Sequence, residues 1–238
     1  MIYQRYFKNG QKLLLNALDR PDNDSRTELL SATMEGGDGD VFILCLPYSM
    51  DATEQYPFVA GMPFEISSDS LGLGIRVTGC IEKKIDGKRI SIKIHSDLQM
   101  FQRRNQSRLD CNLGIRFTRG QGTLKALRTT WEKNIQVLQS PNAPTKLEGF
   151  HICPLNLSSG GIRFALRAPV NPAELCLMLI NLKLDNPPIC ALAEVIWTSP
   201  TKDESIVTSG MRFINILAAD QRRIDDYIAS ARDSVGAA

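Results

Sequence analysis

Two short polar segments of the sequence contain side chains suited to binding an anion. The first, QRRNQSR at residues 102–108, contains three arginines. A guanidinium can grip a phosphate or the O6/N7 edge of guanine with two hydrogen bonds, and it can stack on a base. The Arg-x-x-x-Arg spacing of Arg104 and Arg108 recurs at Arg163 and Arg167, within a predicted strand where it favours a solvated face. Taken alone, the first segment therefore indicates no more than a charged linker.

The second polar segment, NLSSGG, occupies residues 156–161 and precedes the strand-like run IRFAL. Its asparagine and serines offer short hydrogen-bonding side chains. Its glycines permit close approach and backbone conformations that other residues avoid. By itself, this segment predicts an ordinary turn before a strand.

Residues that could carry catalysis or bind a metal are sparse. His95 and His151 are the only histidines, and neither has the spacing of a metal-binding pair. The six cysteines include no Cys-x-x-Cys pair, and no nucleophile elbow, phosphate-binding loop or paired-carboxylate motif occurs. An enzyme is therefore the least favoured class, and we expect neither a metal nor a cofactor.

Composition and net charge limit the classes of protein to which the sequence could belong. Of the 238 residues, 43% are hydrophobic and 23% are charged, as in an ordinary globular protein. The net charge of +2 gives no general attraction for nucleic acid, so an anion site must be local. No apolar run could span a bilayer, and the first residues lack the apolar core of a signal peptide. We expect a cytoplasmic protein with no nucleic-acid binding and no direct membrane insertion.

The first hundred residues predict short strands separated by turns. In RISIKIH, Ile90, Ile92 and Ile94 alternate with polar residues, so one face of this strand should be buried. The Asp86-Gly87 pair predicts a tight hairpin with positive φ at its centre. The expected fold is a small antiparallel barrel. Its strands are predicted at residues 12–18, 27–34, 41–46, 63–66, 75–84 and 89–95.

The second half again predicts strands, with one interruption. Between residues 123 and 139, apolar residues around Trp131 recur at steps of three and four, which predicts an amphipathic helix. Its apolar face either caps an open end of a barrel or forms a dimer or partner surface. A closing helix near the end carries Ile224, Tyr227, Ile228 and Ala231 on one face. Strands are predicted at residues 110–118, 161–167, 175–184, 189–198 and 206–216.

The two polar segments together resemble the signature of PilZ domains, which is Arg-x-x-x-Arg followed by [Asp/Asn]-x-Ser-x-x-Gly. The motif residues are Arg104, Arg108, Asn156, Ser158 and Gly161. The later runs GGIRF, AEVIW and SGMRF are also similar to the family, and GMPFEI resembles the N-terminal barrel of its YcgR group. The resemblance covers essentially the whole chain. Two departures are Gln106 and Ser107 inside the arginine motif, and a long stretch between the two motifs.

The resemblance implies a mainly β protein built from two small antiparallel barrels in tandem. It implies an N-terminal YcgR-like split barrel at 1–101, a linker at 102–109 and a PilZ domain at 110–238 with an inserted and a C-terminal helix. PilZ proteins bind cyclic diguanylate (c-di-GMP), often as a stacked dimer. By resemblance, Arg104 and Arg108 contact guanine edges and phosphates, Asn156 and Ser158 hydrogen-bond a guanine, and Gly161 leaves room for it. Arg103 is an additional candidate phosphate contact.

The resemblance also implies signalling through a change of shape. A linker that folds over a ligand would fix the orientation of two domains. A protein partner such as the flagellar motor is then expected, which would place the protein at the flagellar basal body and link it to motility or biofilm formation. The oligomeric state is left open, with a dimer as one option. The main alternative is a PilZ-like interaction module that binds no ligand.

Overall fold

The computed structural model describes residues 3–18, 26–48, 58–70, 73–102, 106–120, 123–141, 147–167, 170–182, 187–201 and 205–236. The fold is mainly β, as predicted. The chain forms two compact units. The first contains Met1–Asp24, Glu28–Asn105 and Thr123–Lys125, and the second contains Ser25–Thr27, Gln106–Gly122 and Ala126–Ala238.

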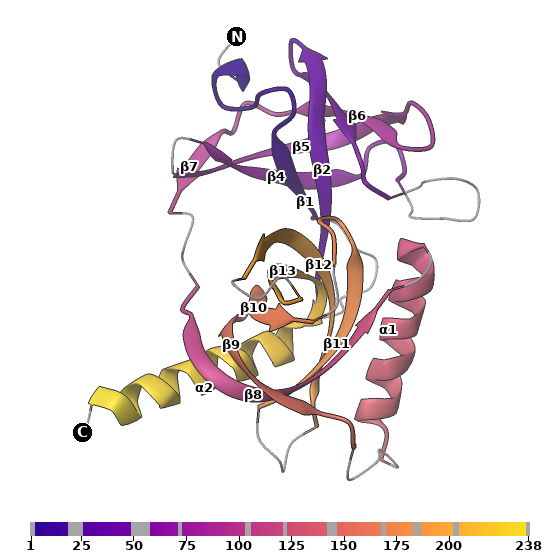
Figure 1. Ribbon diagram of the computed structural model, residues 1–238. Coiled ribbons are helices and arrows are strands. Elements are labelled where there is room, and N and C mark those ends of the chain that lie inside the picture. Colours follow the sequence, from indigo (N-terminus) through magenta and orange to yellow (C-terminus); the bar gives the residue numbers. More distant parts are fainter. Residues whose placement is uncertain are drawn as a thin grey trace. The chain divides into compact units, whose positions relative to one another are not determined.

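The first unit is a closed antiparallel barrel (Figure 1). Around the barrel the strands follow the order β1-β4-β5-β6-β3-β2, and β2 pairs again with β1. A short strand, β7, pairs with β5. The elements are the 3-10 helix η1 (Tyr3–Arg5), β1 (Lys12–Ala17), β2 (Arg26–Asp38), β3 (Val41–Cys45), β4 (Pro63–Ser70), β5 (Leu73–Lys84), β6 (Arg89–Ile94) and β7 (Gln99–Phe101).

The predicted alternation in β6 is confirmed, because Ile90, Ile92 and Ile94 are all buried. The β5–β6 hairpin also forms, but its turn differs from the tight one predicted. Gly87 does not adopt positive φ. Instead, the Asp86 carboxylate accepts hydrogen bonds from the backbone N–H groups of Lys88 and Arg89, which stabilises a longer loop.

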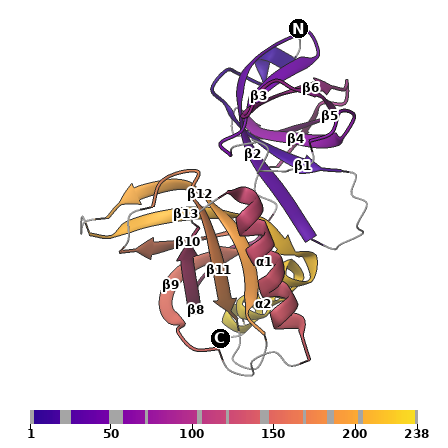
Figure 2. The ribbon, with the colours of Figure 1, turned by 90° about the vertical axis from the view of Figure 1, so that its right-hand side faces the viewer.

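The second unit is another closed antiparallel barrel, with strand order β13-β10-β9-β8-β11-β12 and a final pairing of β12 with β13 (Figure 2). Its strands are β8 (Leu109–Arg119), β9 (His151–Ser158), β10 (Gly161–Leu166), β11 (Leu175–Asn181), β12 (Ile189–Pro200) and β13 (Val207–Leu217). The first seven residues of β12 are buried, so both faces of this part of the strand are covered.

Two helices complete the second unit, α1 (Leu124–Gln139) and α2 (Ala218–Gly236). Trp131 of α1 is 1% exposed, and its indole N–H donates to the Cys190 carbonyl oxygen at 3.0 Å. Trp131 therefore packs against β12, and its ring is not available to a partner, which favours a packing role for this helix over a partner surface. Ile224 and Ile228 of α2 are buried in the barrel core, which confirms the predicted closing helix.

One strand that matters for the site was not predicted. Residues 151–158 form β9, so Asn156 and Ser158 lie in a strand and the turn is confined to Ser159 and Gly160. Pro154 lies within β9 and faces Asn112 of β8. Proline interrupts the usual strand pattern because it lacks an N–H donor, which is why sequence patterning missed this strand.

Candidate ligand-binding site

The register of three neighbouring strands brings the two polar segments to one end of the second barrel. Leu109, the first residue of β8, pairs with Leu157 of β9. Arg108 therefore lies one residue before the sheet begins, at the same end as Ser158. The β9–β10 hairpin closes there, with Ser158 paired to Gly161.

Three hydrogen bonds stabilise the turn between β9 and β10. The Gly160 carbonyl accepts from the backbone N–H of Phe213, and the Ser159 carbonyl accepts from the side-chain amide of Gln221 on α2, both at 3.0 Å. The Ser158 hydroxyl is mostly buried and donates to the Gly161 carbonyl at 3.3 Å. The turn is thus fixed by strand β13 and helix α2 before any ligand arrives.

The two glycines of the turn have different neighbours. A Cβ at Gly161 would meet the carbonyl oxygen of Met211 on β13, so this glycine is required for close packing of the backbones. A Cβ at Gly160 would meet the side-chain amide of Gln106. Gln106 belongs to the arginine segment, and its side chain therefore lies directly over the turn.

The arginine segment is also tied to the C-terminal helix. Arg232 of α2 donates one hydrogen bond to the Ser107 hydroxyl and another to the Arg108 carbonyl oxygen, each at 3.0 Å. The last residues of the segment, Gln106 to Arg108, are therefore held against the second unit, although all three remain exposed.

Beside the turn, three polar side chains form a row across β8, β9 and β10. Asp110 pairs with Asn156, and Asn156 pairs with Arg163. The Asn156 amide nitrogen lies 2.9 Å from Oδ1 of Asp110, and Nη2 of Arg163 lies 3.4 Å from the same oxygen. Leu155 and Leu157, the neighbours of Asn156 on β9, are buried, so the row lies on the outer face of the barrel.

The family of the chain follows from its match to a protein-family model. The model described as "PilZ domain" matches residues 102–230, more than half of the chain. The chain belongs to the PilZ domain family. The matched segment contains both polar motifs, helix α1 and the first two thirds of helix α2.

Solved structures similar to this PilZ protein have low sequence identity to it. The inhibitor of motility MotI/DgrA of Bacillus subtilis is 14% identical, with a TM-score of 0.39 over 96% of this chain and 98% of that one. YcgR of Escherichia coli, solved with c-di-GMP, is 14% identical, with a TM-score of 0.37 over 95% and 85%. MrkH of K. pneumonia, also with c-di-GMP, is 14% identical, with a TM-score of 0.33 over 94% and 89%. Among curated proteins, no match is found.

Within the PilZ domain, the described part of the chain places four of the six predicted site residues. Arg108, Asn156, Ser158 and Gly161 lie at the same end of the barrel. Arg103 and Arg104 lie outside the described residues. Residues that sequence reasoning did not assign to the site are Gln106, Asp110, Gly160, Arg163 and Arg232.

Two of these omissions had a signal in the sequence. Arg163 was noticed for its spacing to Arg167 but interpreted as solvated surface, and it is indeed half exposed. Asp110 follows the motif residue Arg108 by only two positions in the sequence. Without strand β9 in the prediction, the register that joins Asp110 to Asn156 could not be derived.

The two buried cysteines of the PilZ domain contribute to packing. Burial raises the pKa of the Cys176 and Cys190 thiols to about 12, so both remain protonated at neutral pH. Among the described residues, no group of three histidine, cysteine or acidic side chains could hold a metal ion. None of the helices described is long and apolar enough to cross a membrane.

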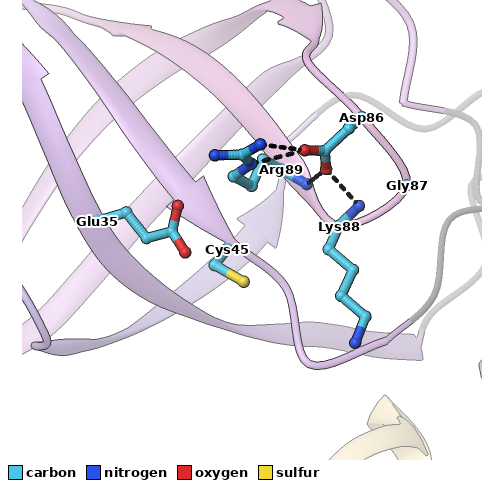
Figure 3. Close-up of a pocket in the computed structure, with 6 residues that line it drawn as sticks. All are labelled: Glu35, Cys45, Asp86, Gly87, Lys88 and Arg89. Carbon is cyan, nitrogen blue, oxygen red and sulfur yellow. Dashed lines mark hydrogen bonds and ion pairs between the residues drawn. The ribbon is translucent and has the colours of Figure 1, made fainter.

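A separate hollow of about 400 Å³ lies on the first unit, outside the matched PilZ segment (Figure 3). Its lining comprises Glu35, Cys45, Asp86, Gly87, Lys88 and Arg89. The backbone N–H of Lys88, followed by the Arg89 side chain, holds the pKa of the Asp86 carboxyl below its usual range by hydrogen bonding to it. Burial and nearby Glu35 raise the pKa of the Cys45 thiol. The two acidic and two basic side chains of this hollow balance each other, so it has no net positive charge that would attract a dianionic ligand.

Proposed function

We propose that this PilZ protein is a receptor for c-di-GMP and performs no chemistry on it. Family membership and the placement of the two motifs support the proposal. The observation that carries it is the meeting of Arg108 with Asn156 and Ser158 at one end of the PilZ barrel. A cationic segment beside a hydrogen-bonded polar turn offers both parts that a guanine dinucleotide requires, namely charge for phosphates and hydrogen bonds for bases.

In this proposal, Arg103, Arg104 and Arg108 contact phosphates and guanine edges, and a guanidinium stacks on a base. Asn156 offers its amide to a guanine. Ser158 contributes a hydroxyl that is already polarised by its bond to Gly161. Gly161 serves mainly the close packing of β10 on β13, whereas the space over Gly160 is where a base would displace Gln106.

We further propose that ligand binding alters the orientation of the two barrels and regulates a protein partner in the cytoplasm. Along the chain, the boundary between the two units falls between Asn105 and Gln106, inside the arginine segment, so a ligand that binds this segment would act on the connection between the units. The flagellar motor, at the basal body, is the partner suggested by resemblance, with motility or biofilm formation as the process. A pull-down with and without c-di-GMP tests it: a partner retained only with ligand supports the proposal.

A thermal-shift titration tests the receptor function itself. A ligand that binds only the folded state stabilises it by about 2.7 kcal/mol at one hundred times its Kd. We therefore expect c-di-GMP, but not GTP at equal concentration, to raise the melting temperature. Equal melting curves with and without c-di-GMP would favour the alternative, an interaction module without ligand binding.

A further inference from the structure

The row formed by Asp110, Asn156 and Arg163 contains a carboxylate that the PilZ motif does not include. Oδ1 of Asp110 accepts from both neighbours, at 2.9 Å from Asn156 and 3.4 Å from Arg163. All three side chains point outward at the end of the barrel where Arg108 lies. A ligand that contacts Asn156 therefore also lies beside Asp110.

Asp110 fixes the orientation of the Asn156 amide. An ionised carboxylate can only accept hydrogen bonds, so the NH₂ group of Asn156 must face it, and the amide oxygen must point elsewhere. Within the described ranges, no group donates a hydrogen bond to the Asn156 amide oxygen or to the second carboxylate oxygen of Asp110. Two neighbouring acceptor oxygens are thus available on the outer face of the sheet.

The fold does not require this carboxylate. The Asp110 side chain is 80% exposed, and its ion pair with Arg163 is exposed as well. Exposed pairs of this kind contribute little to stability because water screens them. A structural role therefore does not account for the placement of Asp110 next to the motif asparagine.

The chemistry of the two acceptors fits one nucleobase edge. The Watson–Crick edge of guanine presents two adjacent donors, the N1–H and the 2-amino group, whereas adenine presents one acceptor and one donor. We propose that Asp110 accepts from the 2-amino group and Asn156 accepts from the N1–H, so that Asp110 determines the specificity of the site for guanine. This inference rests on the proposed function, because it assigns a role within the same c-di-GMP site.

The charge of Arg163 makes this arrangement compatible with an anionic ligand. An unpaired carboxylate would repel the phosphates of c-di-GMP. Arg163 places a positive charge on the same carboxylate oxygen, so the row has no net charge. The acceptor pair faces a base, and the phosphates are left to the arginines of the first motif.

A comparison of two ligands and three proteins tests the proposal. Cyclic di-inosine monophosphate lacks the 2-amino group of guanine but keeps its N1–H and O6. Affinities of both ligands are measured by calorimetry for the wild type, Asp110→Ala and Asp225→Ala. Asp225 lies on the exposed face of α2, so its replacement removes the same charge from the same unit without touching the row.

We expect the wild type to bind c-di-GMP about tenfold more tightly than the inosine analogue, the usual scale for one base contact. Asp110→Ala should lose most of this preference, because its affinity for c-di-GMP falls while that for the analogue changes little. Asp225→Ala should behave as the wild type. Asp110→Asn, which preserves the shape of the side chain, replaces the alanine variant if the latter melts at a lower temperature.

Two results would overturn the proposal in different ways. Equal weakening of both ligands by Asp110→Ala would mean that Asp110 makes no contact with the 2-amino group and acts only on the shape of the site. An absence of binding of either ligand to the wild type would overturn the receptor function itself, and the specificity assignment with it.

Discussion

At the scale of single residues, the two glycines of the β9–β10 turn differ in what surrounds them. Gly161 faces a backbone carbonyl of β13, which cannot move without disturbing the sheet. Gly160 faces the far end of the Gln106 side chain, which can rotate away. Only Gly161 belongs to the family motif, and its packing against β13 gives it a structural reason that is independent of any ligand.

This difference predicts opposite outcomes for two matched substitutions. Gly161→Ala should lower the free energy of unfolding by about 1–3 kcal/mol, because the added methyl overpacks two backbones. Gly160→Ala adds the same methyl one residue earlier and should change the free energy of unfolding by less than about 0.5 kcal/mol. Urea denaturation of both variants measures the difference, and equal losses would refute this account of the turn.

The candidate site residues were proposed from the sequence motif, but their mutual geometry could not be derived from the sequence. Arg108, Asn156, Ser158 and Gly161 were predicted from the motif and meet at one end of the barrel. Asp110 was not predicted, because its relation to Asn156 depends on strand register. Register follows from pairing across the sheet, and it cannot be derived when one of the paired strands is not recognised.

At the scale of elements, helix α2 connects the barrel core to the arginine segment. Ile224 and Ile228 are buried in the core, so the helix is fixed to the barrel. One turn beyond them, Arg232 reaches the Ser107 hydroxyl and the Arg108 carbonyl. The helix thus positions Arg108, the second arginine of the motif, through a hydrogen bond to the main-chain carbonyl of Arg108.

Arg232→Ala should therefore weaken c-di-GMP binding by a few-fold to about tenfold, since each lost hydrogen bond contributes about 0.5–1.5 kcal/mol. The melting temperature should change little, because Arg232 is exposed. Arg222→Ala, another exposed arginine of α2, is the control and should leave the affinity unchanged. Calorimetry measures the c-di-GMP affinity of the three proteins. Identical affinities would show that Arg232 does not contribute to binding.

Sequence periodicity predicted the elements well where apolar residues repeat regularly. Both helices and the strand with Ile90, Ile92 and Ile94 were found on that basis. In α1, Trp131 is buried and hydrogen-bonded to Cys190, which favours a packing role for the helix over a partner surface. Two strands escaped prediction: β7 is only three residues long, and β9 contains a proline. Short or interrupted strands carry too little periodicity to be recognised.

At the scale of the whole molecule, each of the two barrels is closed by an additional strand pairing, β1 with β2 and β12 with β13, and has its own buried apolar residues. Neither barrel leaves an open sheet edge in its closed circuit of strands, so each is expected to behave as a rigid body. A ligand bound at the segment near residue 106 would then act on the connection between two rigid units rather than on their interiors.

This organisation predicts a change in small-angle X-ray scattering when c-di-GMP is added. The radius of gyration or the pair-distance distribution should shift, because the connection between the units is altered. The circular dichroism spectrum should remain the same, because each barrel keeps its fold. Arg108→Ala at the same ligand concentration is the control and should show no shift. Identical scattering curves at saturating ligand would mean that binding is not transmitted to domain arrangement.

Isothermal titration calorimetry with c-di-GMP tests the central claim most directly, on the wild type, Arg108→Ala and Arg116→Ala. Arg116 is an exposed arginine further along the same strand as Asp110, so its replacement controls for lost charge. We predict binding by the wild type and by Arg116→Ala, and a loss of about 1–3 kcal/mol for Arg108→Ala. No heat of binding at tens of micromolar c-di-GMP, or equal affinity of all three proteins, would contradict the assignment of this site.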